Sequence, residues 1–184
     1  MGTYNNKYYE PLEQMMAIRH QYMSKILRNY SGQDIYEYFK NKKILDLGCG
    51  TGEFLYNYCG MGAECLGIDI NNNFKIKNKM NFKLINIEAN KFLKNCKKKF
   101  DVIFLFEFLD HLEEQDKHKL FENLSKKLNK NAYVFISTLN KNLLSKYLAI
   151  DIAENLLKLL PKKLTILIFF YLPLNYNQLV KNIT

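Results

Sequence analysis

The sequence has no tryptophan, only four cysteines and no apolar run long enough to cross a bilayer. The cysteines form neither a C-x-x-C pair nor a Cys/His pattern with zinc-ligand spacing, so a zinc site of that kind is excluded. We interpret them as reduced thiols in a cytosol-like compartment. The sequence has 13 tyrosines and 13 phenylalanines but no tryptophan, and we attribute this composition to codon bias rather than to a functional requirement.

Targeting signals are also missing from the sequence. The N-terminus has no apolar stretch of the secretory kind. Asn6 stands where N-myristoylation favours Ser or Thr. Residues 164–174 are eleven almost entirely apolar residues, whereas a membrane-spanning helix needs about 20. This stretch is therefore expected to be either a late core strand or helix, or an interfacial membrane contact.

Basic residues outnumber acidic ones, 27 to 18, which gives a net charge of +9. An excess of positive charge favours binding either to nucleic acid or to an anionic membrane surface. The lysines are scattered, apart from Lys97–Lys99, and no signature of an RNA-binding module accompanies them. We therefore expect no nucleic-acid partner.

Strand and helix patterns alternate along the chain and predict a doubly wound α/β sheet. The length of 184 residues and the hydrophobic content of 48% suit one domain. Helices are expected over 10–30, 33–39, 53–59, 115–128 and 141–160, and strands over 43–47, 64–70, 82–87, 100–106 and 133–138.

The most informative stretch is an apolar strand that ends in glycines at three alternate positions, Gly48, Gly50 and Gly52. Glycine permits positive φ angles and close approach of a ligand to the backbone. The next apolar stretch ends in Asp69, followed by Ile70, and an acid at that place accepts hydrogen bonds from ribose hydroxyls. Together these residues predict a nucleoside-binding crevice at the carboxyl ends of two parallel strands.

The glycine spacing narrows the choice of nucleoside. A dinucleotide loop, G-x-G-x-x-G, would need its third glycine at position 53, which is Glu53. Asp46 stands two residues before the first glycine, where it would repel a pyrophosphate and could hold a cationic aminoacyl group. The pattern resembles the first motif of the Rossmann-like S-adenosylmethionine (SAM) methyltransferases. The alternative is a glycine-rich turn that binds no ligand.

A second polar group follows the strand expected over 100–106. Glu107, Asp110 and His111 occupy positions i, i+3 and i+4, which project from one face of a helical turn. Two carboxylates and an imidazole are suitable ligands for a divalent cation. The alternative is that the acids complement a helix dipole and His111 is their neighbour.

The order of several fragments resembles the ubiquinone-biosynthesis O-methyltransferases, which methylate polyprenyl catechols such as 3-demethylubiquinol. The resemblance rests on Tyr8–Tyr22, Ile44–Gly52, Gly67–Asp69, Phe100–His111 and Phe135–Lys162. It implies a Rossmann-like SAM-methyltransferase fold with a mainly parallel sheet, helices on both faces and a C-terminal hairpin that is shortened or absent. The implied reaction is methyl transfer from SAM to a catechol hydroxyl of a polyprenylated ubiquinone precursor.

The resemblance also implies roles for individual residues. Arg19 would bind the SAM carboxylate, and Phe106 would lie beside the adenosine. The remaining predicted cofactor-binding residues are Asp46, Gly48, Gly50, Gly52, Asp69 and Ile70. Glu107, Asp110 and His111 fall on the positions that hold Mg²⁺ or another divalent cation. Glu107 and His111 are the predicted catalytic residues, and His111 is alternatively a general base without metal.

The same resemblance divides the single domain into three parts. Residues 1–40 would form a helical lid, 41–140 the SAM-binding core, and 141–184 a helical and apolar segment for substrate or membrane contact. The implied location is cytoplasmic and peripheral on the inner membrane, on the matrix side in a mitochondrion. The implied partners are the polyprenylated catechol or quinol and a quinone-biosynthesis complex.

Three departures from the family pattern keep other functions open. Lys163–Ile166 replaces a Gly-Thr-His-Asp segment, Asp110 replaces a longer Glu, and the sequence ends at Thr184 before the family's last strands. A truncated, reduced or impaired form of the enzyme would account for them. One alternative is therefore a SAM-dependent methyltransferase of another small molecule. The other is a catalytically impaired SAM-binding subunit of a biosynthetic complex.

Overall fold

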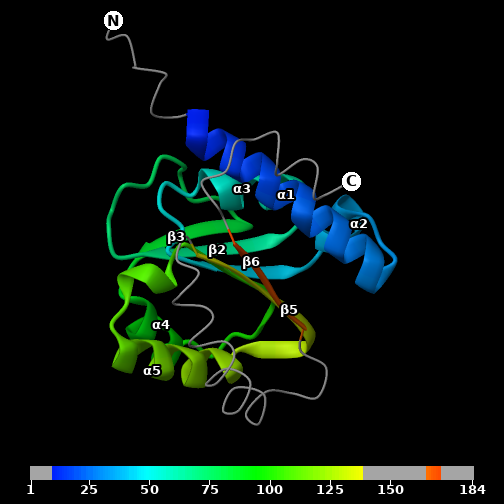
Figure 1. Ribbon diagram of the computed structural model, residues 1–184. Helices are drawn as coiled ribbons and strands as arrows, with labels where there is room; N and C mark the ends of the chain where they lie inside the picture. Colours follow the sequence, from blue (N-terminus) through cyan, green and yellow to red (C-terminus); the bar gives the residue numbers. More distant parts are fainter. Residues whose placement is uncertain (1–9, 139–164, 171–184) are drawn as a thin grey trace, which may run out of the picture.

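The computed structural model describes residues 10–138 and 165–170, which build one six-stranded sheet in the order β3-β2-β1-β4-β5-β6 (Figure 1). All neighbouring strands are parallel. The strands are β1 (Lys43–Leu47), β2 (Glu64–Asp69), β3 (Phe82–Asn86), β4 (Phe100–Phe106), β5 (Leu128–Thr138) and β6 (Thr165–Phe170). The strand order reverses between β1 and β4, and ligands of such sheets bind at the carboxyl ends beside the reversal.

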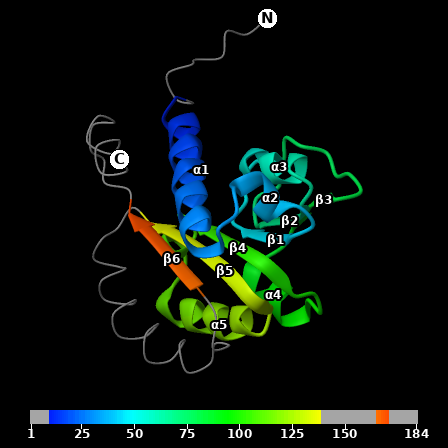
Figure 2. The same cartoon turned by 90° about the vertical axis from the view of Figure 1, so that its right-hand side faces the viewer.

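Helices cover both faces of the sheet, as Figures 1 and 2 show. One face carries α1 (Glu10–Ser31), α2 (Ile35–Phe39) and α3 (Glu53–Gly60), and the other carries α4 (Ala89–Asn95) and α5 (Glu114–Ser125). Successive residues of a central strand enter different cores. Phe104 packs with the core under α1 to α3, and Leu105 packs with the core under α4 and α5. This alternation explains why β4 is continuously apolar.

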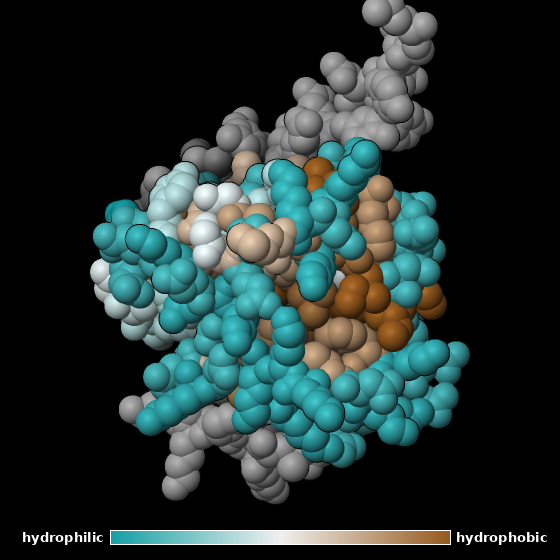
Figure 3. Space-filling model, turned by 180° about the vertical axis from the view of Figure 1, so that it is seen from behind, coloured by the Kyte–Doolittle hydropathy of each residue, from teal (hydrophilic) through white to brown (hydrophobic). Residues whose placement is uncertain are grey.

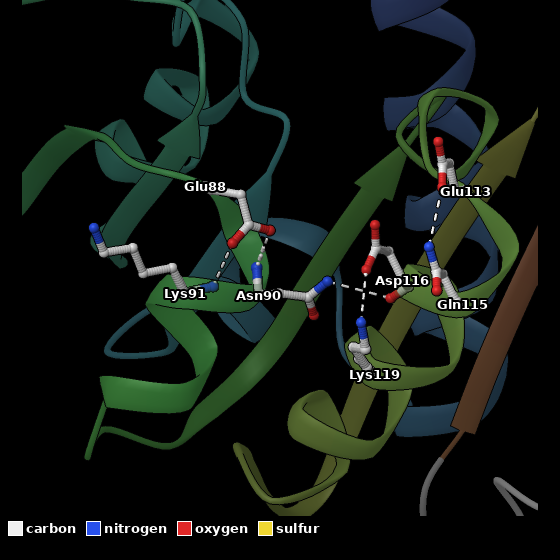
Figure 4. Close-up of polar contacts among 7 residues, drawn as sticks. All are labelled: Glu88, Asn90, Lys91, Glu113, Gln115, Asp116 and Lys119. Atoms are coloured by element: carbon white, nitrogen blue, oxygen red, sulfur yellow. Dashed lines mark hydrogen bonds and ion pairs between the residues drawn. The ribbon is translucent and has the colours of Figure 1, made fainter.

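Helix α4 was not predicted from the sequence. The Glu88 carboxylate caps it by accepting hydrogen bonds from the backbone N–H groups of Asn90 and Lys91, at 2.7 and 2.6 Å (Figure 4). The Asn90 side chain also donates to the Asp116 carbonyl oxygen at 3.2 Å, which ties α4 to α5. The sequence signal was present but short, because only Ala89, Phe92 and Leu93 repeat at helical spacing.

Strand β5 begins earlier than predicted, at Leu128 instead of 133. Leu128 pairs with Phe100, and the register shifts before the next pair, Val102 with Tyr133. Asn131 takes a positive φ of 63° inside this irregular stretch. The irregularity interrupts the apolar pattern, which is why the strand was expected to start only at Tyr133.

The C-terminal apolar stretch contributes a strand to the sheet. β6 pairs in parallel with β5, from Tyr133 opposite Thr165 to Thr138 opposite Phe170. Among the described residues, β5 is thus followed by one parallel strand rather than by an antiparallel hairpin. The helix expected over 141–160 lies outside the described residues. No described helix combines the length and apolarity needed to cross a membrane.

Candidate functional site

The three glycines of the loop after β1 all adopt left-handed backbone conformations. Their φ angles are 80° at Gly48, 55° at Gly50 and 83° at Gly52. A Cβ atom at Gly48 would lie 2.6 Å from the Phe108 ring, and one at Gly52 would lie 2.6 Å from Leu84. Nothing lies within 4 Å of the corresponding position at Gly50. The outer two glycines therefore permit packing, whereas Gly50 borders open space that a ligand can use.

The loop is fastened to the end of β2 by hydrogen bonds. The Gly48 and Cys49 N–H groups donate to the Ile68 carbonyl oxygen at 2.8 and 3.1 Å. One Asp69 carboxylate oxygen accepts from Gly50 N–H at 2.8 Å, and the other accepts from Asn71 N–H at 2.7 Å. The structure therefore brings Asp69 to the glycine loop, as the crevice hypothesis requires.

Ile70 follows Asp69 and is 71% exposed. It offers an apolar surface next to the acid. At the end of the loop, the Thr51 hydroxyl donates a hydrogen bond of 2.8 Å to the Glu53 carboxylate. No role was predicted for either residue from the sequence. Lys75, from the segment after β2, forms an ion pair of 3.2 Å with Glu53. This segment thus lies against the glycine loop.

Asp46 lies at the end of β1 and is only 4% exposed. Burial raises the pKa of its carboxyl to about 7, an effect that Arg19 reduces and Asp69 adds to. Desolvation disfavours the charged form, and a nearby cation favours it. A cationic ligand beside Asp46 would therefore stabilise the ionised carboxylate.

Arg19 reaches the site from helix α1. Its guanidinium carbon lies 4.7 Å from the centre of the Phe106 ring and 5.7 Å from that of Phe54. The guanidinium also forms an ion pair with Glu107. Since the Arg19 side chain is only 11% exposed, these contacts form where solvent screening is weak. Sequence reasoning did not predict that Arg19 and Glu107 would meet.

Glu107 follows β4 directly and adopts a φ of 48°, which is unusual for a residue with a side chain. Its backbone N–H donates to the Ser137 carbonyl oxygen at 3.0 Å. The Ser137 hydroxyl donates to Glu107 Oε1 at 2.6 Å, while Arg19 binds Oε2. Ser137 is fully buried near the end of β5. In the sequence, Ser137 is a single polar residue near the end of an apolar run, and no role was predicted for it.

The premise of a helical turn over Glu107, Asp110 and His111 is wrong. Glu107 has a left-handed conformation, and only Leu109–His111 form a 3₁₀ turn, η2. Within residues 10–138 and 165–170, no three His, Cys, Asp or Glu side chains gather in an arrangement that could hold a metal ion. Since Arg19 and Ser137 engage both Glu107 oxygens, the predicted metal ligands do not fit a cation as they are arranged.

A concavity of about 890 Å³ lies on the helical side of the molecule. It is lined by α1 residues that include His20, Lys25 and Arg28, together with Phe54 and Met61. Burial lowers the pKa of His20. No predicted site residue lines this concavity, which sets it apart from the crevice predicted at the glycine loop.

Comparisons with known proteins agree with this geometry. Residues 15–181 match the model of a methyltransferase domain family. A ubiquinone biosynthesis O-methyltransferase of Pelagibacter ubique is 36% identical over 166 residues, which are 85% of this chain and 67% of the relative. The corresponding protein of Aliivibrio fischeri is 29% identical over 161 residues, 84% of this chain and 64% of the relative. The chain thus spans about two thirds of the length of these relatives.

Solved structures share the fold at low sequence identity. A SAM-dependent methyltransferase from Archaeoglobus fulgidus superposes with a TM-score of 0.51 and 23% identity, covering 96% of this chain and 73% of that one. The plantazolicin methyltransferase BamL gives a TM-score of 0.58 and 19% identity, covering 97% and 65%. The Rossmann-like methyltransferase fold predicted from the sequence is thereby confirmed.

Proposed function

Because the chain belongs to the methyltransferase domain family, and to the ubiquinone biosynthesis O-methyltransferases within it, we propose that it transfers a methyl group from SAM to a catechol hydroxyl of a polyprenylated ubiquinone precursor. The observation that carries the proposal is the joint between the glycine loop and Asp69 at the carboxyl ends of β1 and β2. Such a joint binds an adenosine through its ribose hydroxyls while the backbone approaches the ligand closely.

The residues at the carboxyl ends of β1 and β2 offer groups that complement the adenosine and amino-acid parts of SAM. Asp69 would accept from the ribose, and Gly50 borders the open space beside it. Asp46 and Arg19 offer opposite charges that match the α-ammonium and the α-carboxylate. Phe106 would pack beside the adenosine. BamL, which shares the fold, was solved in complex with SAH, the demethylated product of SAM, and this agrees with the assignment.

The reaction needs orientation and a proton acceptor, because the sulfonium already makes the methyl group electrophilic. The acceptor oxygen forms a bond to the methyl carbon as the S–CH₃ bond breaks, and SAH leaves. His111, exposed on the turn η2 near the end of β4, would take the hydroxyl proton as general base. Holding the oxygen in line with the methyl group is the other large contribution to the rate.

A divalent cation such as Mg²⁺ is the second element of the prediction. In that prediction Glu107, Asp110 and His111 are the ligands, and lowering the pKa of the attacking hydroxyl is the chemistry that a bound cation supplies. The present arrangement does not fit a cation, since Arg19 and Ser137 engage Glu107. We therefore assign no step to the metal and make metal dependence an outcome of the experiment.

We also propose that the protein docks on an anionic inner-membrane surface, where a long-tailed substrate resides, and joins a quinone-biosynthesis complex there. The net charge of +9 supports the membrane contact. Figure 3 shows apolar side chains gathered in one area of an otherwise largely hydrophilic face. Sedimentation with vesicles of neutral and of anionic lipid tests this contact, and equal binding to both would contradict it.

The deciding experiment measures transfer of labelled methyl from SAM to a short-tailed demethylubiquinol, with Mg²⁺ and with EDTA. Transfer supports the proposed function, and its loss in EDTA would restore the metal hypothesis. Transfer to a water-soluble phenol but not to the demethylubiquinol would favour a methyltransferase of another small molecule. SAM binding with no transfer to either would favour a SAM-binding subunit.

A further inference from the structure

The ion pair between Arg19 and Glu107 joins a predicted cofactor-binding residue to a predicted catalytic residue. Arg19 is the cation that lies beside Asp46 and over the Phe106 ring. Glu107 lies at the carboxyl end of β4 on the side toward β5, since its backbone and side chain both bind Ser137. The pair therefore spans the boundary between the cofactor part and the acceptor part of the site.

A carboxylate from SAM would compete with Glu107 for this guanidinium. The place already holds two acids, Asp46 and Glu107, around one arginine. A further carboxylate in such a poorly solvated place is repelled by the Glu107 carboxylate unless that group withdraws. Asp46 lies within β1, whereas Glu107 follows the last residue of β4. Glu107 is therefore the group that gives way.

Ser137 retains Glu107 when Arg19 is lost. The buried hydroxyl binds Oε1 at 2.6 Å, and the Ser137 carbonyl oxygen accepts from Glu107 N–H at 3.0 Å. Neither bond involves Arg19. The left-handed φ of 48° at Glu107 is held by these two contacts, and strained conformations persist where the surroundings fix them.

We propose that the carboxylate of SAM displaces Glu107 from Arg19, and that Ser137 then positions the released Glu107 toward the acceptor. SAM therefore binds before the acceptor. This inference rests on the proposed function, and it makes Ser137 a positioning residue rather than a catalytic one.

The exchange is tested by calorimetry with two ligands, SAH and methylthioadenosine, which lacks the amino-acid part. Replacement of Glu107 by Gln removes the competing charge, so we expect SAH to bind about fivefold or more tightly. The affinity for methylthioadenosine should change less than about twofold. The control Glu64→Gln removes a carboxylate that pairs with Lys98 away from the site, and it should alter neither affinity.

The outcomes separate this inference from the proposed function. Normal SAH binding by the wild-type protein, with no gain in Glu107→Gln, would overturn the exchange alone. Failure of the wild-type protein to bind either ligand would overturn the proposed function and the exchange together. A gain for both ligands would also overturn the exchange, because methylthioadenosine carries no carboxylate.

The role of Ser137 is tested by turnover. Replacement by Ala should lower kcat by about tenfold or more, with the affinity for SAH within about twofold of wild type. Ser137→Thr keeps the hydroxyl and should restore most of kcat. Ser125→Ala, which loses a hydroxyl bond to the Glu122 carbonyl oxygen on the surface, is the control. An unchanged kcat in Ser137→Ala, or equal losses in SAH affinity and kcat, would overturn the positioning role.

Discussion

The two halves of the candidate site are built in different ways. Around β1 and β2, backbone N–H groups and glycine conformations shape the surface, and Asp69 is held by Gly50 and Asn71. Around β4 and β5, charged side chains shape it, and Glu107 is held by Arg19 and Ser137. A backbone surface is already formed before its ligand arrives. Under the proposed exchange, the charged side chains change partners when SAM binds.

The largest effect is expected from removing the acid of the backbone-built half. Asp69→Ala should weaken SAM binding by about 100-fold or more, because bonds to a charged group contribute about 1.5–3 kcal/mol each. Calorimetry measures it. Asp101→Ala is the matched control, since that carboxylate also accepts a backbone N–H, from Lys43 at 2.8 Å, but lies near the amino end of β4, away from the carboxyl ends of the strands. Equal weakening in both variants would show that fold stability, not the ribose contact, was lost.

Substitutions of two loop glycines distinguish an effect on packing from an effect on ligand binding within the same half. Gly48→Ala should lower the free energy of unfolding by about 2–3 kcal/mol, since its Cβ would collide with the Phe108 ring. Gly50→Ala should cost only about 1 kcal/mol, for the positive φ, yet it should reduce SAM affinity. Urea unfolding and calorimetry on both variants check this. Similar stability losses at the two positions would contradict the assignment of open space to Gly50.

Arginine substitution sharpens the contrast between the halves. Arg19→Gln should weaken SAH binding by about 10-fold to 100-fold, the contribution of a charged hydrogen bond. Binding of methylthioadenosine should persist, because Asp69 and the glycine loop bind the adenosine part. Asp69→Ala, in contrast, should weaken the binding of both ligands. If Arg19→Gln weakened the binding of both ligands, the arginine would act on the adenosine part as well, and this would contradict the division of the site into two halves.

Sequence reasoning succeeded where single segments decide the structure. The apolar runs of β1 and β4 predicted their bounds correctly, and the meeting of Asp69 with the glycine loop follows from two adjacent parallel strands. The left-handed φ of Glu107 and its bond to Ser137 were not predicted. Arg19 meets Glu107 only because α1 packs over the sheet. Such contacts join residues distant in sequence, and no local pattern encodes them.

Another predicted effect concerns pH and Asp46, the residue between the two halves. Asp46 holds its proton in the folded protein up to about pH 7, because burial raises the pKa of its carboxyl. The unfolded chain releases that proton near the ordinary value of about 4. The folded state therefore binds more protons between these values, and stability falls as pH rises from about 4 to about 7. Asp46→Asn should remove this fall, as unfolding at several pH values will show.

The same ionisation governs how tightly SAH binds. The α-ammonium of the ligand favours ionised Asp46, so binding near neutral pH should release a proton. Affinity should rise by about threefold to tenfold between about pH 6 and pH 8. Arg19 and Asp69 face the same carboxyl, and we assign the change to Asp46. Calorimetry on Asp46→Asn should show weaker binding and a flat profile; an unchanged slope would assign the proton to another group.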